Sequence, residues 1–268
     1  MKNSILKKII PIILFLYSLG SFACTCSSTN TDKSFLTSNF VAKIKILKKY
    51  ENVDGSEFYK ADIEILDLYK GEKTESILIY GNYKNKQDSA CWIYTEENEN
   101  LIIYANLNSE NKETVYACGR VIYLDKVIFN TKNGEFNKQK IYDREIDILT
   151  TLKANKIDYS NNGKIYFDIS CFLRLIAIDL NNEISKKEVD EFGIFEFTIG
   201  KDFKVSKVNV IKGFNKKIDR EIKKIIKQQR WTKEFGTENK LNQGTKSFVT
   251  INYKTSNNGY RYFRGISM

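Results

Sequence analysis

Histidine is absent from this sequence of 268 residues. Its absence excludes Ser-His-Asp and Cys-His catalysis, HExxH zinc sites and histidine-ligated metals in general. Neither a GxGxxG nor a GxxxxGKS/T phosphate-binding loop is present. Because no other catalytic constellation is visible, we predict that the protein is not an enzyme and that it has no cofactor and no metal of its own.

Proline is almost absent, and the one proline lies in an apolar run at 9–19. Three lysines come before this run, and Ser21-Phe22-Ala23 follows it. A charged start, an apolar run and small residues just before a cleavage point are the parts of a secretory signal. The run has 11 residues, whereas a membrane span takes about 20. We therefore predict a signal peptide at 1–23, cleaved at Ala23-Cys24, and an exported protein of the periplasm, cell envelope or medium.

A lipoprotein signal is the alternative, in which Cys24 carries lipid. Leucine is usual three residues before the modified cysteine of such signals, and Ser21 stands there instead. Ordinary cleavage is therefore our prediction. We expect contact with a membrane only if Cys24 is lipidated.

Cysteines are few, and they stand at 24, 26, 91, 118 and 171. An exported chain meets an oxidising compartment, where disulfides form and persist. The first four cysteines could make two bridges, in any of three connectivities. Neighbouring CxC cysteines rarely pair with each other, so Cys24 and Cys26 should each reach a distant strand. Cys171 is left over and is expected to be a buried thiol.

Acidic residues are outnumbered by basic ones, 33 to 43, and the net charge is +10. A basic protein could bind nucleic acid, anionic lipid or acidic glycan. The chain is also rich in Lys, Asn and Ile, as an AT-rich genome would give, so we attribute the charge to composition. Export argues further against nucleic acid, and we expect none as a partner.

Short strands with alternating apolar residues fill the first half of the chain. They are predicted at 40–50, 59–69, 77–80, 101–105 and 115–117, with turn residues between them. Strands at this spacing indicate a small all-β barrel or sandwich. A period of 3.6 residues over 141–154 predicts a helix that packs on the barrel. Glu96-Glu97-Asn98-Glu99 is expected to be a charged turn rather than a calcium site.

The second half has a different pattern. A hairpin is predicted at 193–199 and 204–211, an amphipathic helix at 215–229 and a closing strand at 248–253. This order indicates an α+β sandwich with the helix on one face of an antiparallel sheet. The predicted architecture is therefore mixed, with a signal at 1–23, a first domain at 24–155, a second domain at 164–255 and a tail at 256–268.

The predicted amphipathic helix has one strongly basic face. Its basic residues are Lys216, Lys217, Arg220, Lys223, Lys224 and Lys227. In a lysine-rich chain we expect this face to be solvated. A patch for anionic lipid or glycan is the alternative.

Several motifs of the first half recur in one known family. They are Cys24-Thr25-Cys26, 39–44, Tyr69-Lys70-Gly71, Cys91 with 101–105, and Cys118-Gly119-Arg120. In order and spacing they resemble the netrin-like domain, and within it the branch of tissue inhibitors of metalloproteinases (TIMP-like) and similar bacterial exported proteins. The resemblance implies a five-stranded OB-type barrel with flanking helices. It also implies the disulfides Cys24-Cys91 and Cys26-Cys118.

In the animal inhibitors of this family, the first cysteine chelates the zinc of a target protease through its α-amino group and carbonyl oxygen. The second residue fills the adjacent specificity pocket, so the resemblance assigns these roles to Cys24 and Thr25. The chelate would occupy the position that a catalytic zinc keeps open. The family's third inhibitory-domain bridge, however, has no cysteines here. Inhibition of a zinc metalloprotease is therefore our alternative function.

Motifs of the second half resemble the C-terminal domain of TonB. They are 195–199, 204–213, Ile218-Asp219, Gln229-Arg230-Trp231 and 249–253, while the proline expected after the tryptophan is missing. In TonB this domain adds a strand to an extended segment of an outer-membrane receptor. The resemblance implies a protein partner bound by strand addition. We predict a non-enzymatic protein-binding module, since the retained membrane helix and proline-rich spacer of a true TonB are not expected here.

Overall fold

The structure is a computed structural model of the chain. It describes residues 31–52, 55–84, 91–125, 138–158, 165–166, 192–200, 204–228, 232–233, 244–255 and 261–265. The predictions for the signal at 1–23, the CxC segment and Cys171 lie outside these residues, as does the motif Gln229-Arg230-Trp231.

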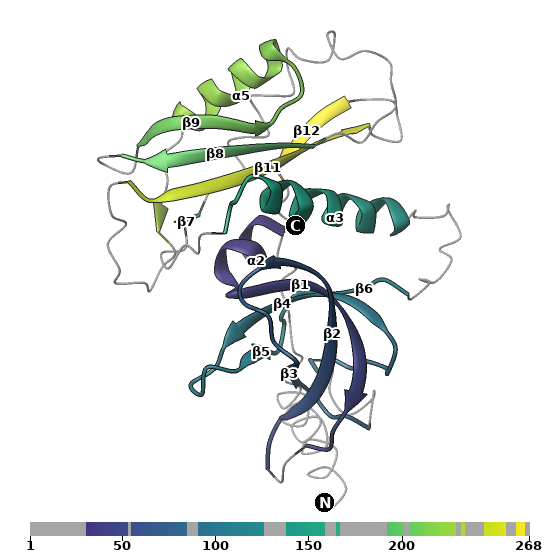
Figure 1. Cartoon of the computed structure of the whole chain (residues 1–268). Helices are drawn as coiled ribbons and strands as arrows, with labels where there is room; N and C mark the ends of the chain where they lie inside the picture. The colour runs from purple at the N-terminus through teal and green to yellow at the C-terminus, as the bar shows by residue number, and fades with distance from the viewer. Residues whose placement is uncertain are drawn as a thin grey trace, which may run out of the picture.

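Five strands of the first half close into a barrel (Figure 1). They are β1 (Phe40–Lys49), β2 (Phe58–Lys70), β3 (Ser76–Tyr80), β4 (Asn100–Leu107) and β5 (Glu113–Val115). Neighbouring strands follow the order β1-β2-β3-β5-β4, and β1 also pairs with β4. The β3–β5 pairing is parallel, and the other pairings of the barrel are antiparallel. The predicted all-β barrel is confirmed.

Alternation along the strands explains the barrel interior. Successive side chains of a strand point to opposite faces, so Phe40, Ala42, Ile44 and Ile46 of β1 all lie inside, fully buried. The β1–β2 register shifts at three places, and such bulges bend a strand. The bending lets β1 pair with β2 on one side and with β4 on the other.

One part of the barrel's outer surface is also apolar, and two helices cover it. Val41, Ile102 and Tyr104 point out of the barrel and are buried. They pack against α2 (Thr31–Thr37) and α3 (Lys138–Ala154). The helix predicted at 141–154 is therefore present and packs on the barrel as expected, whereas α2 was not predicted.

The second half forms an antiparallel sheet with the order β12-β11-β8-β9. Its strands are β8 (Phe192–Ile199), β9 (Val205–Lys212), β11 (Lys246–Thr255) and β12 (Arg261–Gly265). The helix α5 (Lys216–Gln228) packs on one face through its four isoleucines, which are 0–8% exposed. Hairpin, helix and closing strand lie where they were predicted, but β12 falls in the segment predicted to be a tail.

The opposite face of this sheet packs on α2 and α3. Phe192, Ile194 and Phe248 share a buried cluster with Phe35 of α2 and Leu149 of α3. Figure 1 shows the two helices between the barrel below and the sheet above. Helices therefore cover both faces of the sheet, whereas the sequence predicted a helix on one face. As a result, six consecutive residues of β8 are buried.

Three short strands complete the described elements. β6 (Val121–Tyr123) pairs with β4 beside the barrel, and β7 (Ile165–Tyr166) pairs with β10 (Thr232–Lys233) in a sheet of their own. The segment 96–99 is a turn between paired segments, with Asn98 at a φ of 68°. None of the helices described here is long and apolar enough to cross a membrane.

Candidate functional site

The predicted inhibitory residues Cys24 and Thr25 lie outside the described residues, as does Cys26. Their predicted partners are described, and both Cys91 and Cys118 are disulfide-bonded. Cys91 is 5% exposed, beside the backbone link from Ile93 N–H to the Tyr80 carbonyl. Which cysteine each of the two binds is not shown by the described part of the chain, so the pairings Cys24-Cys91 and Cys26-Cys118 stay predictions.

The turn at Cys118-Gly119-Arg120 has a geometry that explains its residues. Cys118 has a φ of 61°, and Gly119 N–H donates to the Tyr116 carbonyl at 2.7 Å. A Cβ atom on Gly119 would lie 2.7 Å from that same carbonyl oxygen. The turn therefore needs glycine, and it directs Arg120 towards α3.

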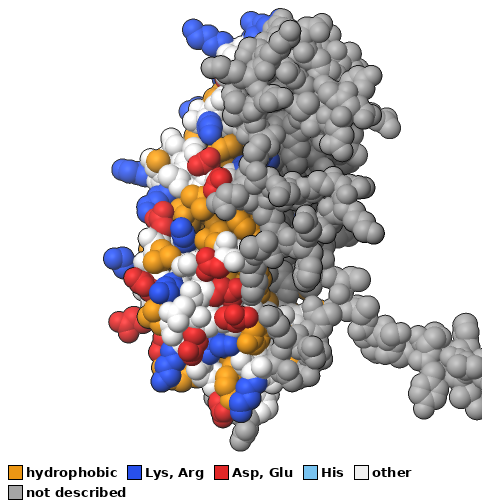
Figure 2. Space-filling model, turned by 90° about the vertical axis from the view of Figure 1, so that its right-hand side faces the viewer, with side chains coloured by type: hydrophobic (Ala, Val, Ile, Leu, Met, Phe, Trp, Pro, Cys, Tyr) orange, Lys and Arg blue, Asp and Glu red, His pale blue; other side chains and the backbone are white. Residues whose placement is uncertain are grey.

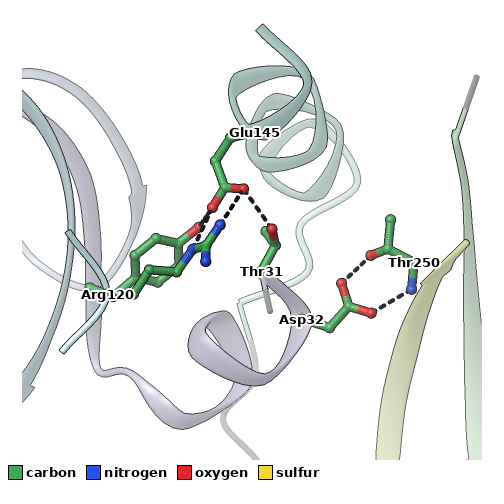
Figure 3. Close-up of polar contacts among 6 residues, drawn as sticks. Thr31, Asp32, Arg120, Glu145 and Thr250 are labelled. Carbon is green, nitrogen blue, oxygen red and sulfur yellow. Dashed lines mark hydrogen bonds and ion pairs between the residues drawn. The ribbon is translucent and has the colours of Figure 1, made fainter. Parts of the chain in front are cut away.

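Arg120 meets a buried carboxylate on α3, and the two form the centre of a polar network (Figure 3). The guanidinium donates from Nε and Nη2 to the two oxygens of Glu145, at 3.0 and 2.9 Å. The same carboxylate accepts from Thr31 Oγ1 at 2.6 Å and from the Tyr104 hydroxyl. One buried side chain thus joins α2, β4, the turn after β5, and α3.

Two members of this network have shifted pKa values. Burial and the charge of Glu145 raise the pKa of Tyr104 well above its usual value, so its hydroxyl remains a donor. Burial lowers the pKa of Arg120, but the ion pair with Glu145 outweighs that effect and the net pKa is raised. A bidentate, charge-assisted ion pair of this kind fixes the orientation of the two side chains as well as the distance between them.

The neighbouring Asp32 connects α2 to the second sheet. Its carboxylate accepts from the Thr250 backbone N–H at 2.6 Å and from the Thr250 hydroxyl, and the residue is 6% exposed. Figure 3 shows two neighbouring residues of α2 pointing to different elements, Asp32 to Thr250 of β11 and Thr31 to Glu145 of α3. Burial raises the pKa of Asp32 from 3.8 to about 7, although the Thr250 hydrogen bonds lower it in part.

A buried lysine holds α2 from the barrel side. Lys70, at the end of β2, donates from Nζ to the Phe35 carbonyl at 2.6 Å and is 5% exposed. Burial lowers the pKa of its amine to about 8. α2 is therefore fixed by contacts to the barrel, to α3 and to β11.

This arrangement holds α2 in place between the barrel, α3 and β11. All four carboxylate oxygens of Asp32 and Glu145 accept hydrogen bonds. α2 begins five residues after Cys26. Over the described residues, no group of three or more Cys, Asp and Glu side chains could hold a metal ion.

Sequence reasoning missed these anchoring residues. The one local signal was Thr31-Asp32 at the start of α2, because Thr and Asp are preferred at helix N-termini. Thr31 and Glu145 are 114 residues apart, and Asp32 and Thr250 are 218 apart. Contacts of that range leave no pattern in a single sequence.

The second sheet offers a different kind of site, namely its edges. β11 pairs with β8 on one side and with β12 on the other, from Ile251 to Thr255. β9 pairs with β8, and no other strand of the described chain lies against its outer edge. An edge strand presents unpaired N–H and C=O groups that can pair with another chain.

Comparison with known proteins assigns no family. No protein-family model matches the chain. A stretch of 135 residues, 50% of the chain, is 24% identical to protein translocase subunit SecA of Campylobacter concisus (strain 13826). The stretch covers 15% of that protein, so the chain spans well under a fifth of this relative's length.

Proposed function

We propose that this protein is an exported, non-enzymatic protein-binding module of the periplasm or cell envelope, and that its second sheet binds a partner by strand addition. The observation that supports this most directly is the outer edge of β9, which no described strand covers. Strand addition uses the backbone groups of such an edge and makes small demands on side chains.

The cover of the sheet on both faces favours this function. α5 covers one face, and α2 and α3 cover the other. A partner strand would therefore meet an edge that is already ordered, which lowers the entropic cost of association. The order of β8, β9, α5 and β11 along the chain agrees with the resemblance of this segment to the C-terminal domain of TonB. The proposal of strand addition rests on this resemblance.

The strand order of the barrel favours an OB-type, netrin-like scaffold for the first part of the chain. Its order β1-β2-β3-β5-β4 with closure onto β1, and its parallel β3–β5 pair, suit a five-stranded barrel of that type. In this proposal the barrel positions α2 and the N-terminal segment, while the sheet binds the partner.

Proline substitutions in β9 test strand addition. Lys207 and Val210 lie in the regular part of the β8–β9 register, and residues an odd number apart direct their N–H groups to opposite sides. Proline has no backbone N–H. One of the two variants, Lys207→Pro or Val210→Pro, therefore loses a hydrogen bond to β8 and has a lower Tm, while the other loses an N–H donor on the outer edge. We expect the variant with the unchanged Tm to lose the partners that the wild-type protein captures from an envelope extract. Equal capture by that variant would contradict the proposal.

Inhibition of a zinc metalloprotease through Cys24 and Thr25 is the second candidate. It is favoured by the disulfide-bonded state of Cys91 and Cys118 and by the anchoring of α2 just after the CxC segment. Intact mass and a non-reduced peptide map of protein recovered from cells test it. If the chain begins at Cys24 with an unmodified α-amino group, and the Cys24 thiol is bridged to Cys91, a panel of zinc proteases should be tested. Thr25→Gly is then expected to abolish inhibition. A lipid on Cys24 would exclude this function.

A further inference from the structure

A groove lies beside the uncovered edge of the second sheet, between β9 and α5. Its volume is about 670 Å³. Val210 lines it from β9, and the basic residues that line it from α5 are Lys216, Arg220, Lys223, Lys224 and Lys227. The groove therefore combines an apolar side chain, a strand edge and five positive charges.

Acidic side chains nearby do little to neutralise these charges. Asp219, which also lines the groove, accepts from the Phe214 backbone N–H at 2.9 Å and so closes the turn before α5. Glu221 lies 3.7 Å from Arg220 and 4.0 Å from Lys224, at the limit of an ion pair. Among the residues that the structure describes, no carboxylate pairs with Lys216, Lys223 or Lys227.

Four of the cations form a single stripe along the helix. Lys216, Arg220, Lys223 and Lys227 are separated by four, three and four residues, which keeps them on one side of an α-helix. With a rise of about 1.5 Å per residue, the stripe is about 16 Å long and has a charge every 5–6 Å or so. Side chains on one face of an extended strand are about 6.7 Å apart. The two spacings are similar enough for alternate side chains of a strand to face successive cations.

We propose that this groove binds an extended polypeptide segment with acidic residues at alternate positions. The segment pairs with the outer edge of β9 and lays its carboxylates along the stripe on α5. This inference rests on the proposed function of strand addition, and adds the edge that is used and the chemical class of the partner.

A membrane surface fits this site less well. A helix that binds in a bilayer surface inserts its apolar face, whereas the isoleucines of α5 are buried against the sheet. A concave site beside a strand edge also suits a chain better than a flat surface. Figure 2 shows Lys and Arg side chains at the top of the molecule, at the height of α5, and a mixture of both signs over the barrel below.

A synthetic peptide supplies the test. The probe is a fluorescent nonapeptide of alternating Glu and Val or Thr, titrated into the full-length mature protein and followed by anisotropy. A peptide with Gln for each Glu tests charge, and an acidic peptide N-methylated at alternate residues tests backbone pairing. We expect saturable binding of the acidic peptide, and binding at least roughly tenfold weaker for each of the other two.

Protein variants locate the binding site. Lys223→Gln/Lys227→Gln removes two charges of the stripe. Lys217→Gln/Lys73→Gln removes the same charge, from α5 outside the groove lining and from an exposed turn of the barrel. Exposed ion pairs contribute modestly, so we expect the loss of two of them to weaken binding roughly two- to thirtyfold and the second pair of substitutions to leave binding unchanged.

The contrary outcomes separate this inference from the proposed function. Equal binding of the Gln peptide would overturn the acidic partner and leave strand addition standing. Equal binding of the N-methylated peptide would overturn strand addition itself. Binding only to vesicles of phosphatidylglycerol and phosphatidylcholine, and not to the acidic peptide, would overturn the inference in favour of a membrane surface.

Discussion

The carboxylate of Asp32 accepts two hydrogen bonds from Thr250, a residue 218 positions later in the chain. Beside this contact, the rings of Phe35 and Phe248 meet edge to face with centroids 5.9 Å apart. Both contacts join α2 to β11, so α2 is part of the support of the second sheet. We therefore expect the barrel and the sheet to unfold together, with Asp32 as a main link between them.

Asp32 should make stability depend on pH. Its pKa is raised from 3.8 to about 7 in the folded protein, so between these values the folded state binds more protons than the unfolded state. The free energy of unfolding that this group contributes is then full below about pH 4 and is lost as the pH rises to about 7. Urea unfolding at several pH values measures this dependence.

Asp32→Asn provides the control for that measurement, because its side chain does not titrate and can still accept from the Thr250 N–H. We expect the wild-type protein to lose stability relative to this variant as the pH rises from 4 to 7. Parallel pH profiles for the two proteins would mean that Asp32 does not titrate in this range.

Removing the charge of Glu145 should be strongly destabilising. Glu145→Gln leaves the Arg120 guanidinium, 23% exposed, without its counter-ion. Breaking a buried pair by removing one partner costs about 3–5 kcal/mol, and we expect a value near the lower end because Arg120 keeps some contact with water. Denaturant unfolding measures the change.

A matched surface pair is the control for Glu145→Gln. Lys112 and Glu110 form an ion pair with both side chains more than 60% exposed, and Glu110→Gln should leave the unfolding midpoint unchanged. The double variant Glu145→Gln/Arg120→Gln should recover part of the loss. If Glu145→Gln proves as harmless as Glu110→Gln, the network does not hold α2 and α3 to the barrel.

Two glycines with similar backbone angles should differ in their tolerance of alanine. Gly71 and Gly55 have φ values of +89° and +77°, so alanine costs about 1 kcal/mol at either position. A Cβ at Gly71 would also lie 2.6 Å from the Asn39 carbonyl oxygen, while Gly55 has nothing within 4 Å. We expect Gly71→Ala to lower the Tm clearly more than Gly55→Ala, and equal shifts would contradict the close approach of β2 to the start of β1.

Periodicity predicted most of the regular elements. β1 to β4 and α5 lie within a few residues of their predicted bounds. The barrel-facing side chains of the strands and the isoleucines of α5 are apolar at a regular period, although β1 and β4 also bury outward-facing residues such as Val41 and Ile102. α2 has only seven residues, too few for a period of 3.6 to show. β12 has five residues and forms a strand by pairing with β11. The sequence of β12 alone does not indicate this pairing.

The sites were predictable to different degrees. The cation stripe was visible in the sequence as a basic helix face, but its position beside the edge of β9 depends on how α5 packs. The network of Glu145 and Arg120 combines residues from four segments, so the sequence identified the helix that carries Glu145 without identifying the contact. The disulfides Cys24-Cys91 and Cys26-Cys118 remain predictions from family resemblance.

Hydrogen–deuterium exchange of the β9 backbone amides, with and without the acidic nonapeptide, tests the central claim most directly. If β9 accepts a partner strand, the peptide should slow exchange at the β9 amides whose N–H groups face outward, and leave the barrel amides unchanged. These amides alternate along the regular stretch from Lys207 to Val210. The Gln peptide should have a much smaller effect. Unchanged exchange in β9 at a peptide concentration that saturates the anisotropy signal would contradict strand addition at this edge.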